Sequence, residues 1–256
     1  MFIFFHMVTK EELEKQIRNC FTDKYEIASG YVIPEIDDIQ LGNYGKELDL
    51  AMLFIDIKES TKIVDAFRRE TAVKMYKSFL WGVAQIARGN GGELRSFNGD
   101  GVLVVFIGSS KCTNAVRAGL QMSWFVKEIL KPRIQGYFRE NKKLFGLNFD
   151  IGIGVDVGKI LVVRGGIRGE NNNDLVWVGN ATNYAVKLSS LAKPSVLGFL
   201  SNTTEDLRVC ISEEVYKRIN KSIKFRSGNF FIKMPMWNKF TWKDRNIYKN
   251  KFMLPI

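Results

Sequence analysis

Histidine is nearly absent from this sequence, and cysteine is scarce. His6 is the only histidine among 256 residues, which argues against a catalytic triad containing histidine and against a histidine-rich metal site. The three cysteines, Cys20, Cys112 and Cys210, are odd in number and widely separated. That pattern indicates a reducing, cytoplasmic setting, with neither a disulfide framework nor a zinc motif.

Long apolar runs are also lacking. No stretch is long enough to span a bilayer, so we expect no membrane insertion. The apolar start, Met1–Met7, is too short for a secretory signal and has no basic residues, and Met7 is an alternative start of translation. With 46% hydrophobic and 25% charged residues, the composition is that of an ordinary globular protein.

Basic residues outnumber acidic ones and give a formal net charge of +11. The excess fits an anionic partner, such as a nucleotide, a nucleic acid or a membrane surface, and equally fits a solvated basic surface. Basic residues become denser from Lys233 to Lys251, where they alternate with Trp237, Phe240, Trp242 and Tyr248. Aromatic residues in such a pattern can contact nucleic acid, but more often they belong to a core or a dimer interface.

Hydrophobic periodicity predicts the element order β-α-β-β-α-β, a ferredoxin-like core in an α/β (α+β) fold. The predicted core elements are a strand over 48–56, a helix over 60–88, a hairpin of 93–97 with 102–106, a helix over 110–131 ended by Pro132, and a strand over 147–155 joined to 160–163 by a turn at 156–159. The predicted flanking elements are a helix over 9–22 capped by Thr9 and Glu12, an irregular lead-in over 28–48, a strand over 174–178, a helix over 181–193, a strand over 207–211 and a helix from 212. We therefore expect an N-terminal helix and lead-in, 1–47, followed by one domain, 48–256.

Two aspartates lie where apolar strands end. Asp56 closes the first strong strand, and Asp100 lies in the turn of the predicted hairpin. A half-buried carboxylate is costly unless it is paired or bound to a metal, and strands are depleted in aspartate. Because the first strand and the hairpin are neighbours in this topology, the two carboxylates are expected to lie close together and to hold Mg²⁺ against a nucleoside triphosphate. The turn Ile57–Thr61 then opens a helix whose free backbone N–H groups suit phosphate oxygens.

Three more segments complete a collinear pattern. Gly152–Lys159 and Gly165–Gly169 form a glycine-rich strand pair, and Asp174–Leu188 runs into a helix that carries an asparagine and a basic residue. With a metal aspartate in a strand and Gly-Asp in a hairpin before them, the chain resembles the class III nucleotide cyclases over about 48 to 191.

The resemblance implies a role for each matching residue. Asp56 and Asp100 would bind two Mg²⁺ or Mn²⁺ ions, with the Ile57 carbonyl assisting. Asn183 would orient the ribose, and Lys187 stands where the family has a transition-state arginine. Lysine supplies the charge but not the bidentate fork of arginine. Sites of this family form between two subunits, so Asn183 and Lys187 would complete the metal site of a homodimer partner.

Candidate nucleotide contacts fall in the turn after Asp56, where phosphate would bind, and on the strands beside it, where a base would pack. Each has an ordinary alternative, because charged side chains at such places are often exposed and aromatic ones often belong to the core. These residues are Phe54, Lys58, Ser60, Thr61, Arg95, Phe97 and Trp177.

Base recognition departs from the purine-specific members of the family. Ser96 and Val176 occupy the two positions where those members carry their purine-reading side chains, and valine cannot hydrogen-bond through its side chain. The lead-in Ile33–Asn43 and the segment Leu53–Thr61 resemble the bacterial pyrimidine cyclases of the Pycsar antiphage defence. That resemblance implies formation of cyclic UMP from UTP, or of cyclic CMP from CTP, to activate a separate effector protein.

Other interpretations stay open at this point. One is an adenylate or guanylate cyclase, and another is a catalytically silent cyclase-like module that binds a nucleotide, which only Lys187 favours. A third is a basic ferredoxin-like domain that binds nucleic acid. The acidic pair Asp56 and Asp100 argues against the third, because these carboxylates would repel phosphates in the absence of metal.

Overall fold

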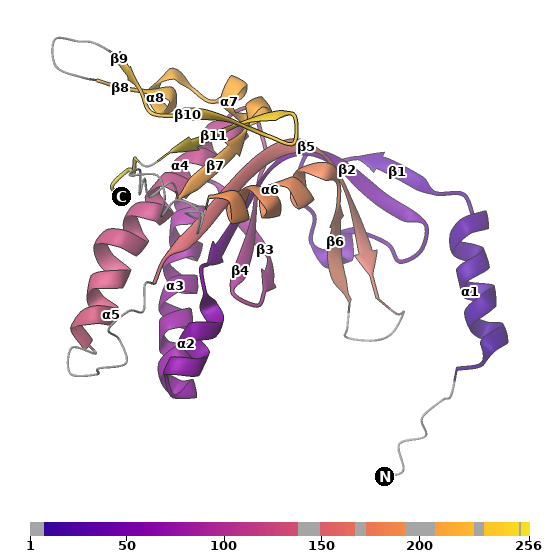
Figure 1. Cartoon of the computed structure of the whole chain (residues 1–256). Helices are drawn as coiled ribbons and strands as arrows, with labels where there is room; N and C mark the ends of the chain where they lie inside the picture. The colour runs from indigo at the N-terminus through magenta and orange to yellow at the C-terminus, as the bar shows by residue number, and fades with distance from the viewer. Residues whose placement is uncertain (1–7, 138–148, 167–172, 193–207, 228–232, 251) are drawn as a thin grey trace. The chain divides into compact units, whose positions relative to one another are not determined.

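The computed structural model describes residues 8–137, 149–166, 173–192, 208–227, 233–250 and 252–256 (Figure 1). The chain forms two compact units: residues 1–48 with 161–178, and residues 49–160 with 179–256. The division into domains 1–47 and 48–256 remains a prediction. In the structure, residues 161–178 group with the N-terminal segment in one compact unit.

The larger unit is an α/β structure built on one mixed sheet, with antiparallel and parallel strand pairs, in the strand order β10-β11-β7-β5-β2-β4-β3. Two long strands, β2 (Tyr44–Ile57) and β5 (Ile151–Gly165), lie at its centre. Its other elements are α2 (Ser60–Ala66), α3 (Arg69–Gly89), β3 (Gly92–Asn98), β4 (Gly101–Phe106), α4 (Lys111–Trp124), the π-helix η2 (Phe125–Leu130), α5 (Lys131–Tyr137), α6 (Asn180–Leu191), β7 (Val209–Ser212), α7 (Glu213–Arg218), α8 (Lys221–Lys224), β8 (Phe225–Ser227), β9 (Lys233–Pro235), β10 (Asn238–Trp242) and β11 (Arg245–Asn250). The predicted α/β class is confirmed.

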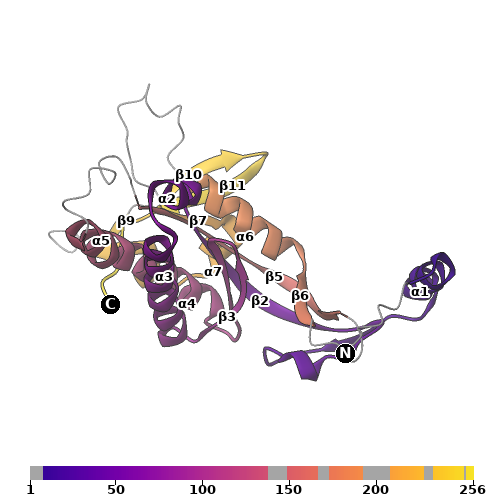
Figure 2. The same ribbon diagram turned by 90° about the horizontal axis from the view of Figure 1, so that it is seen from below.

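Helices cover both faces of this sheet, with α3 and α4 on one side and α6 on the other (Figure 2). Alternating strand residues explain the two faces, because successive side chains of a strand point to opposite sides. Leu53 and Ile153 belong to the main core beneath α3 and α4 and approach Gly119 of α4. The next residue, Gly154, faces α6 so closely that an added Cβ would lie 2.0 Å from the Ala185 carbonyl oxygen. Glycine at this position is what lets α6 pack directly on the sheet.

The smaller unit holds α1 (Lys10–Thr22), β1 (Glu26–Ser29), a 3-10 turn at Ile36–Asp38 and β6 (Asp174–Val178). β1 pairs in parallel with the first residues of β2, and β6 pairs antiparallel with the last residues of β5. The predicted capping box of α1 is confirmed, since Thr9 and Glu12 bond reciprocally at 2.8 and 3.2 Å. The lead-in is less irregular than expected, because it contains the end of β1, the 3-10 turn and the start of β2.

The single helix predicted over 60–88 is two helices. Phe67 is extended, with φ −120° and ψ 161°, and it separates α2 from α3. Its partly buried ring packs against the main core. The apolar periodicity runs through the break because Ile63 of α2 and Ala72 of α3 are both buried in that core.

Pro132 does not end the second helix, so that prediction was wrong. The chain passes from α4 through the π-helix η2 into α5, and Pro132 is the second residue of α5. A proline inside continuous helical backbone leaves one carbonyl of the preceding turn without an N–H partner, and the π-helical turn before it, where Lys131 bonds back to Val126, is an irregularity of the kind found at such places.

The predicted turn at 156–159 was also wrong, because β5 runs unbroken through it. Residues Ile153–Val155 of β5 pair with β7, before the part that pairs with β6. Asp156 suggested a turn, but it is buried in the strand and accepts a hydrogen bond from Ser212. Hydrogen bonds from Ser212 and from the Val157 backbone offset part of the cost of burying this carboxylate, and burial still raises its pKa above the ordinary value.

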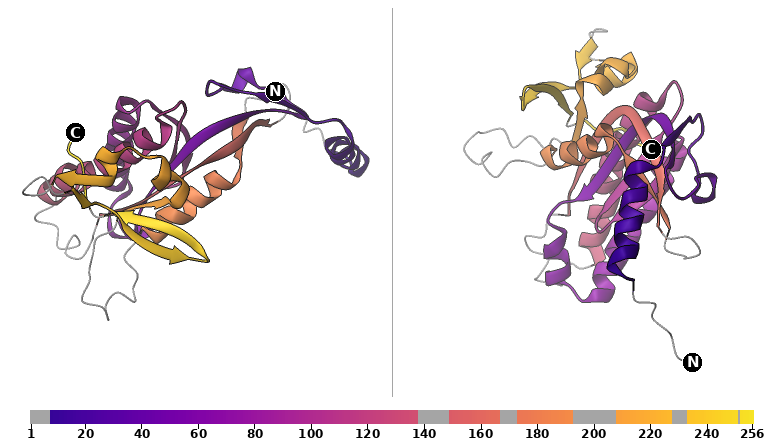
Figure 3. Two further views of the ribbon diagram at one scale, coloured as in Figure 1. Left: turned by 90° about the horizontal axis from the view of Figure 1, so that it is seen from above. Right: turned by 90° about the vertical axis from the view of Figure 1, so that its right-hand side faces the viewer.

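The C-terminal strands extend the sheet beyond β7, and β10 and β11 form the yellow hairpin of Figure 3. Trp237 is buried and donates its indole N–H to the Ile223 carbonyl at 2.8 Å. Tyr248 stacks on Tyr216 with ring centroids 3.8 Å apart. These two C-terminal aromatics are therefore packing residues, as the alternative to nucleic-acid contact expected.

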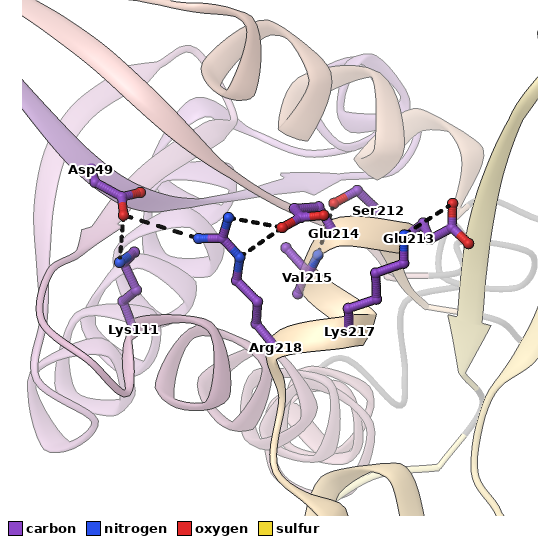
Figure 4. Close-up of polar contacts among 8 residues, drawn as sticks. All are labelled: Asp49, Lys111, Ser212, Glu213, Glu214, Val215, Lys217 and Arg218. Atoms are coloured by element: carbon purple, nitrogen blue, oxygen red, sulfur yellow. Dashed lines mark hydrogen bonds and ion pairs between the residues drawn. The ribbon is translucent and has the colours of Figure 1, made fainter.

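Polar contacts tie the edge of this unit together (Figure 4). Asp49 of β2 forms an ion pair with Lys111 of α4 at 3.0 Å and another with Arg218 of α7 at 4.0 Å. Arg218 also pairs with Glu214 at 2.8 Å. Asp49 is half exposed, so these pairs contribute little stability and chiefly fix how α7 lies against β2 and α4.

Candidate active site

The two candidate metal ligands lie at the same end of neighbouring strands. β2 and β4 pair antiparallel, and Asp56 stands opposite Gly101, the residue after Asp100. A two-residue turn joins β3 to β4, and Gly99 in that turn has φ +64°, a conformation that favours glycine. The turn therefore presents Asp100 beside the end of β2, where the sequence pattern predicts a carboxylate pair.

Tyr76 of α3 joins this pair. Burial raises the pKa of its phenol, the carboxylates of Asp100 and Asp56 raise it further, and a hydrogen bond with Ser60 opposes the shift. The structure thus brings Asp56, Ser60, Tyr76 and Asp100 to one place. Sequence reasoning missed Tyr76, because it reads as one member of the apolar stripe of its helix, and only its hydroxyl distinguished it from core residues.

The donor set suits a hard divalent cation. Two carboxylates and the carbonyl oxygen of Ile57 are oxygen ligands, which Mg²⁺ and Mn²⁺ prefer over nitrogen or sulfur. Within the described part of the chain, no cluster of three or more His, Cys, Asp or Glu side chains could hold a metal. One or two carboxylates completed by water and substrate phosphates are the usual magnesium site of nucleotide enzymes, so the residues present fit such an ion.

A buried ion-pair network anchors the residue that follows Ile57. The Lys58 ammonium lies 3.2 Å from one carboxylate oxygen of Asp150, and the Arg208 guanidinium lies 2.7 Å from the other. The Lys58 backbone N–H also donates to the Asp150 carbonyl at 2.8 Å. Burial would raise the pKa of Asp150, but the two cations and the bonds to Arg208 and Ile151 lower it below its ordinary value. The role of Lys58 as a phosphate contact stays a prediction, and the structure shows its amine engaged by Asp150.

The turn after β2 is tight. Glu59 has φ 53°, a left-handed conformation that costs energy for a residue other than glycine. Ser60 is half-buried at the start of α2, and Thr61 is exposed. Phe54 is buried, and its ring lies so close to Gly101 that a Cβ there would meet it at 2.3 Å. Phe54 therefore packs under the hairpin, and its part in a base pocket remains a prediction.

Helix α6 presents Asn183 and Lys187 on its exposed side. The two residues are four apart and so lie on one face of the helix. The opposite side packs on the sheet through Tyr184 and Leu188, which are buried with Cys210. This exposure is what a site shared between two subunits requires, and the roles of both residues stay predictions.

The two expected base-reading positions lie on strands. Ser96 on β3 follows a β-bulge between Leu94 and Ser96, a feature that re-aims side chains near active sites. Val176 on β6 is 47% exposed, and its neighbour Trp177 is buried. The nucleotide roles of Phe97 and Arg95 stay predictions: Phe97 is exposed, and Arg95 pairs with Glu93. The glycine-rich residues Ile167–Gly169 lie outside the described residues.

No protein-family model matches the chain. It is 34% identical over 250 residues to a uridylate cyclase of Xanthomonas perforans, covering 96% of this chain and 98% of that one. The chain belongs to the uridylate cyclase family. A second uridylate cyclase, from Burkholderia cepacia, is 31% identical and spans 94% of this chain and 96% of its own length. A cytidylate cyclase of Staphylococcus aureus is 28% identical over 220 residues, which are 47% of its length.

Solved structures place this uridylate cyclase family member in the fold of class III cyclases. The guanylyl cyclase Cya2 matches with a TM-score of 0.60 at 18% identity, over 82% of this chain and 94% of that chain. The adenylyl cyclase CyaB of P. aeruginosa matches with a TM-score of 0.59 at 20% identity, over 80% and 95%. At such identities the likeness shows the fold alone. Among the described residues, no helix has the length and apolar character needed to cross a membrane.

Proposed function

We propose that this nucleotide cyclase converts UTP to cyclic 3′,5′-UMP and pyrophosphate. The observation that carries the proposal is the pair Asp56 and Asp100 at neighbouring strand ends, in a chain 34% identical to a uridylate cyclase over nearly its whole length. In the reaction, the 3′-oxygen of the ribose forms a bond to the α-phosphorus. The bond from that phosphorus to the bridging oxygen breaks, pyrophosphate leaves, and the hydroxyl proton passes to solvent.

Asp56, Asp100 and the Ile57 carbonyl would hold two Mg²⁺ or Mn²⁺ ions, whose chemistry is to neutralise the triphosphate and to acidify the ribose hydroxyl. The protein groups mainly position the substrate and stabilise charge, as in other phosphoryl transfers. Ser60 and Thr61 open α2 beside this pair and would meet the phosphates.

The active unit is a homodimer with two composite sites. Asn183 of the partner subunit would orient the ribose, and Lys187 of the partner subunit would stabilise the charge that develops on the phosphate. Their exposure on one side of α6 supports this arrangement, because a single chain leaves them free to reach another copy.

The base is a pyrimidine, and the likeness to uridylate cyclases favours uracil over cytosine. Ser96 offers one hydroxyl that can donate or accept a hydrogen bond, whereas Val176 offers none. A purine would lose the specific bonds that its own cyclases supply, at about 1–3 kcal/mol for each buried group left unpaired. The product would act as a second messenger of antiphage defence in the cytoplasm, where it activates a separate effector protein that the cyclase itself does not contact.

Product analysis tests the proposal. The protein is incubated with each of the four NTPs and Mn²⁺, and the cyclic products are identified by mass spectrometry, with Asp56→Ala as the control. We expect cyclic UMP from the wild type and none from the control. Absence of every cyclic nucleotide would contradict the cyclase assignment, and cyclic AMP or GMP as the main product would contradict only the base.

A further inference from the structure

Two residues of the C-terminal hairpin pack against one side chain of helix α6. The ring of Trp242 on β10 lies 6.1 Å from the ring of Tyr184 on α6, centroid to centroid, with the two planes tilted by 36°. The Arg245 guanidinium on β11 lies over the same tyrosine ring, 5.3 Å from its centroid. The hairpin therefore contacts the helix that carries Asn183 and Lys187.

The register of the hairpin fixes this pair of residues. Trp242 and Arg245 stand directly opposite each other on β10 and β11, so their side chains share one face of the hairpin. The two-residue turn Lys243–Asp244 joins them, and both of its residues have positive φ, 46° and 61°, as a short hairpin turn requires. β11 also pairs with β7, whose Cys210 belongs to the same buried cluster as Tyr184. The pair therefore reaches α6 from a strand that is anchored in the main sheet.

The contact between α6 and the middle of the sheet is smooth. Gly154 of β5 faces the helix without a side chain, and an added Cβ would lie 2.0 Å from the Ala185 carbonyl oxygen and 2.4 Å from the Ser189 nitrogen. Packed helices normally interlock through side chains that enter grooves of the neighbouring surface. A glycine sets the distance between strand and helix but inserts no side chain that stops the helix from turning about its axis. That rotation depends on the large buried side chains of α6, Tyr184 and Leu188.

A small rotation of α6 matters because of where its other residues lie. Tyr184 directly follows Asn183 and comes three residues before Lys187. Side-chain tips lie about 5–6 Å from the axis of a helix, so a rotation of about 10° moves them by about 1 Å. A displacement of that size in a catalytic group can lower a rate by about 10². A contact that fixes the rotation of α6 therefore acts on both residues at once.

We propose that Trp242 and Arg245 are positioning residues of the cyclase. Through Tyr184 they hold α6 at the rotation that directs Asn183 and Lys187 at the reacting nucleotide. The proposal rests on the proposed function, and it assigns neither hairpin residue a contact with the nucleotide. It also specifies the subunit in which the pair acts, namely the one that supplies α6 to a composite site and not the one that supplies the metal pair.

A heterodimer with one working site tests where the pair acts. When Asp56→Ala and Asn183→Ala chains are mixed, the working site takes its metal ligands from the Asn183→Ala chain and its α6 residues from the Asp56→Ala chain. We expect Trp242→Ala to lower turnover at least about tenfold when it is added to the Asp56→Ala chain. The same substitution in the Asn183→Ala chain should leave turnover unchanged, and Arg245→Ala should show the same asymmetry. A general loss of folding or of dimers would lower turnover in both placements.

Homodimers provide the matched comparisons. Trp242→Ala in the otherwise unmutated chain should lower turnover at least about tenfold, and Trp242→Phe, which keeps a ring, should restore most of it. Thr241→Ala is the control, because it is exposed and points to the other face of the hairpin. Beside Lys187→Ala, the further effect of Trp242→Ala should be clearly smaller, because the two changes act on the same groups.

Each result separates the positioning role from the proposed function. Equal losses in the two heterodimer placements, or unchanged turnover of the Trp242→Ala homodimer, would overturn the positioning role. An inactive mixture of the two parent variants would refute the shared site alone, and the comparison with Lys187→Ala in homodimers would then decide. An undiminished effect of Trp242→Ala beside Lys187→Ala would overturn the positioning role. Absence of any cyclic nucleotide from the unmutated protein would instead refute the proposed function.

Discussion

The Lys58 ammonium and the Asp150 carboxylate form a buried ion pair at 3.2 Å, two residues beyond Asp56. The pair joins the end of β2 to the start of β5, and Arg208 closes it from the other side at 2.7 Å. Breaking a buried pair leaves an uncompensated charge, which typically costs about 3–5 kcal/mol. The network therefore holds the end of β2, which carries Asp56 and Ile57, and the turn that follows it.

Asp150→Asn should lower the stability of the protein by about that amount at neutral pH, because Lys58 and Arg208 lose their counter-charge. Asp49→Asn is the matched control, since its pairs are half exposed and worth less than about 1 kcal/mol. Urea denaturation monitored by fluorescence measures both. Equal destabilisation by the two variants would contradict the structural role of Asp150.

At acidic pH the stability difference between the wild type and Asp150→Asn should disappear. The folded-state pKa of Asp150 lies below its ordinary value of 3.8, so the ionised form contributes stability above that value. This contribution is lost as the pH falls below 3.8 through the lowered folded-state pKa. Melting temperatures of wild type and Asp150→Asn should converge in that range, and a constant difference down to pH 2 would be inconsistent with the shift.

Asp56→Ala or Asp100→Ala should abolish turnover and leave the fold intact. Two neighbouring carboxylates repel, so the melting temperature without added metal should be unchanged or higher in either variant. Asp65→Ala on α2, with an exposed side chain, is the control that should keep full activity. Full turnover in either metal-pair variant would refute the role of that aspartate.

Mixing two inactive variants tests the shared site. Asp56→Ala combined with Asn183→Ala should restore one working site in each heterodimer, because each subunit supplies the half that the other lacks. Activity is measured while the subunits exchange, and differently tagged subunits show how far the exchange has gone. If exchange is complete and the mixture stays inactive, each site lies within one chain.

Lys187→Ala should lower the turnover number by about 10²–10³, the usual effect of removing one donor from a developing anion. Lys187→Arg should keep or raise it, because arginine adds a bidentate fork to the same charge. Ser190→Ala on the same helix is the control, with an exposed side chain. Wild-type turnover in Lys187→Ala would remove this residue from the mechanism.

Much of the fold follows from the sequence because strands and helices here keep their own periodicity. The hairpin around Gly99 and the paired position of Asp56 follow from a glycine turn and two apolar runs. Tertiary contacts explain where the predictions from the sequence pattern were wrong. Asp156 lies in a strand with Ser212 bonded to its carboxylate, and Phe67 breaks a helix because the core accepts its ring.

The closeness of Asp56 and Asp100 could be predicted because chemistry and spacing agree, whereas a contact that joins distant segments could not be. Asp56 and Asp100 stand out because carboxylates are rare at strand ends. Lys58 reads as a turn charge until Asp150, 92 residues away, is seen against it. The sequence alone does not show that two residues so far apart along the chain are in contact.

Competition among the four nucleotides measures which base this cyclase prefers. Equimolar ATP, GTP, CTP and UTP are offered to the wild-type protein with Mn²⁺, and the cyclic products are quantified together. We expect cyclic UMP in at least about tenfold excess over cyclic AMP and cyclic GMP, the ratio that corresponds to one well-placed hydrogen bond. A predominance of cyclic AMP or cyclic GMP would contradict this expectation.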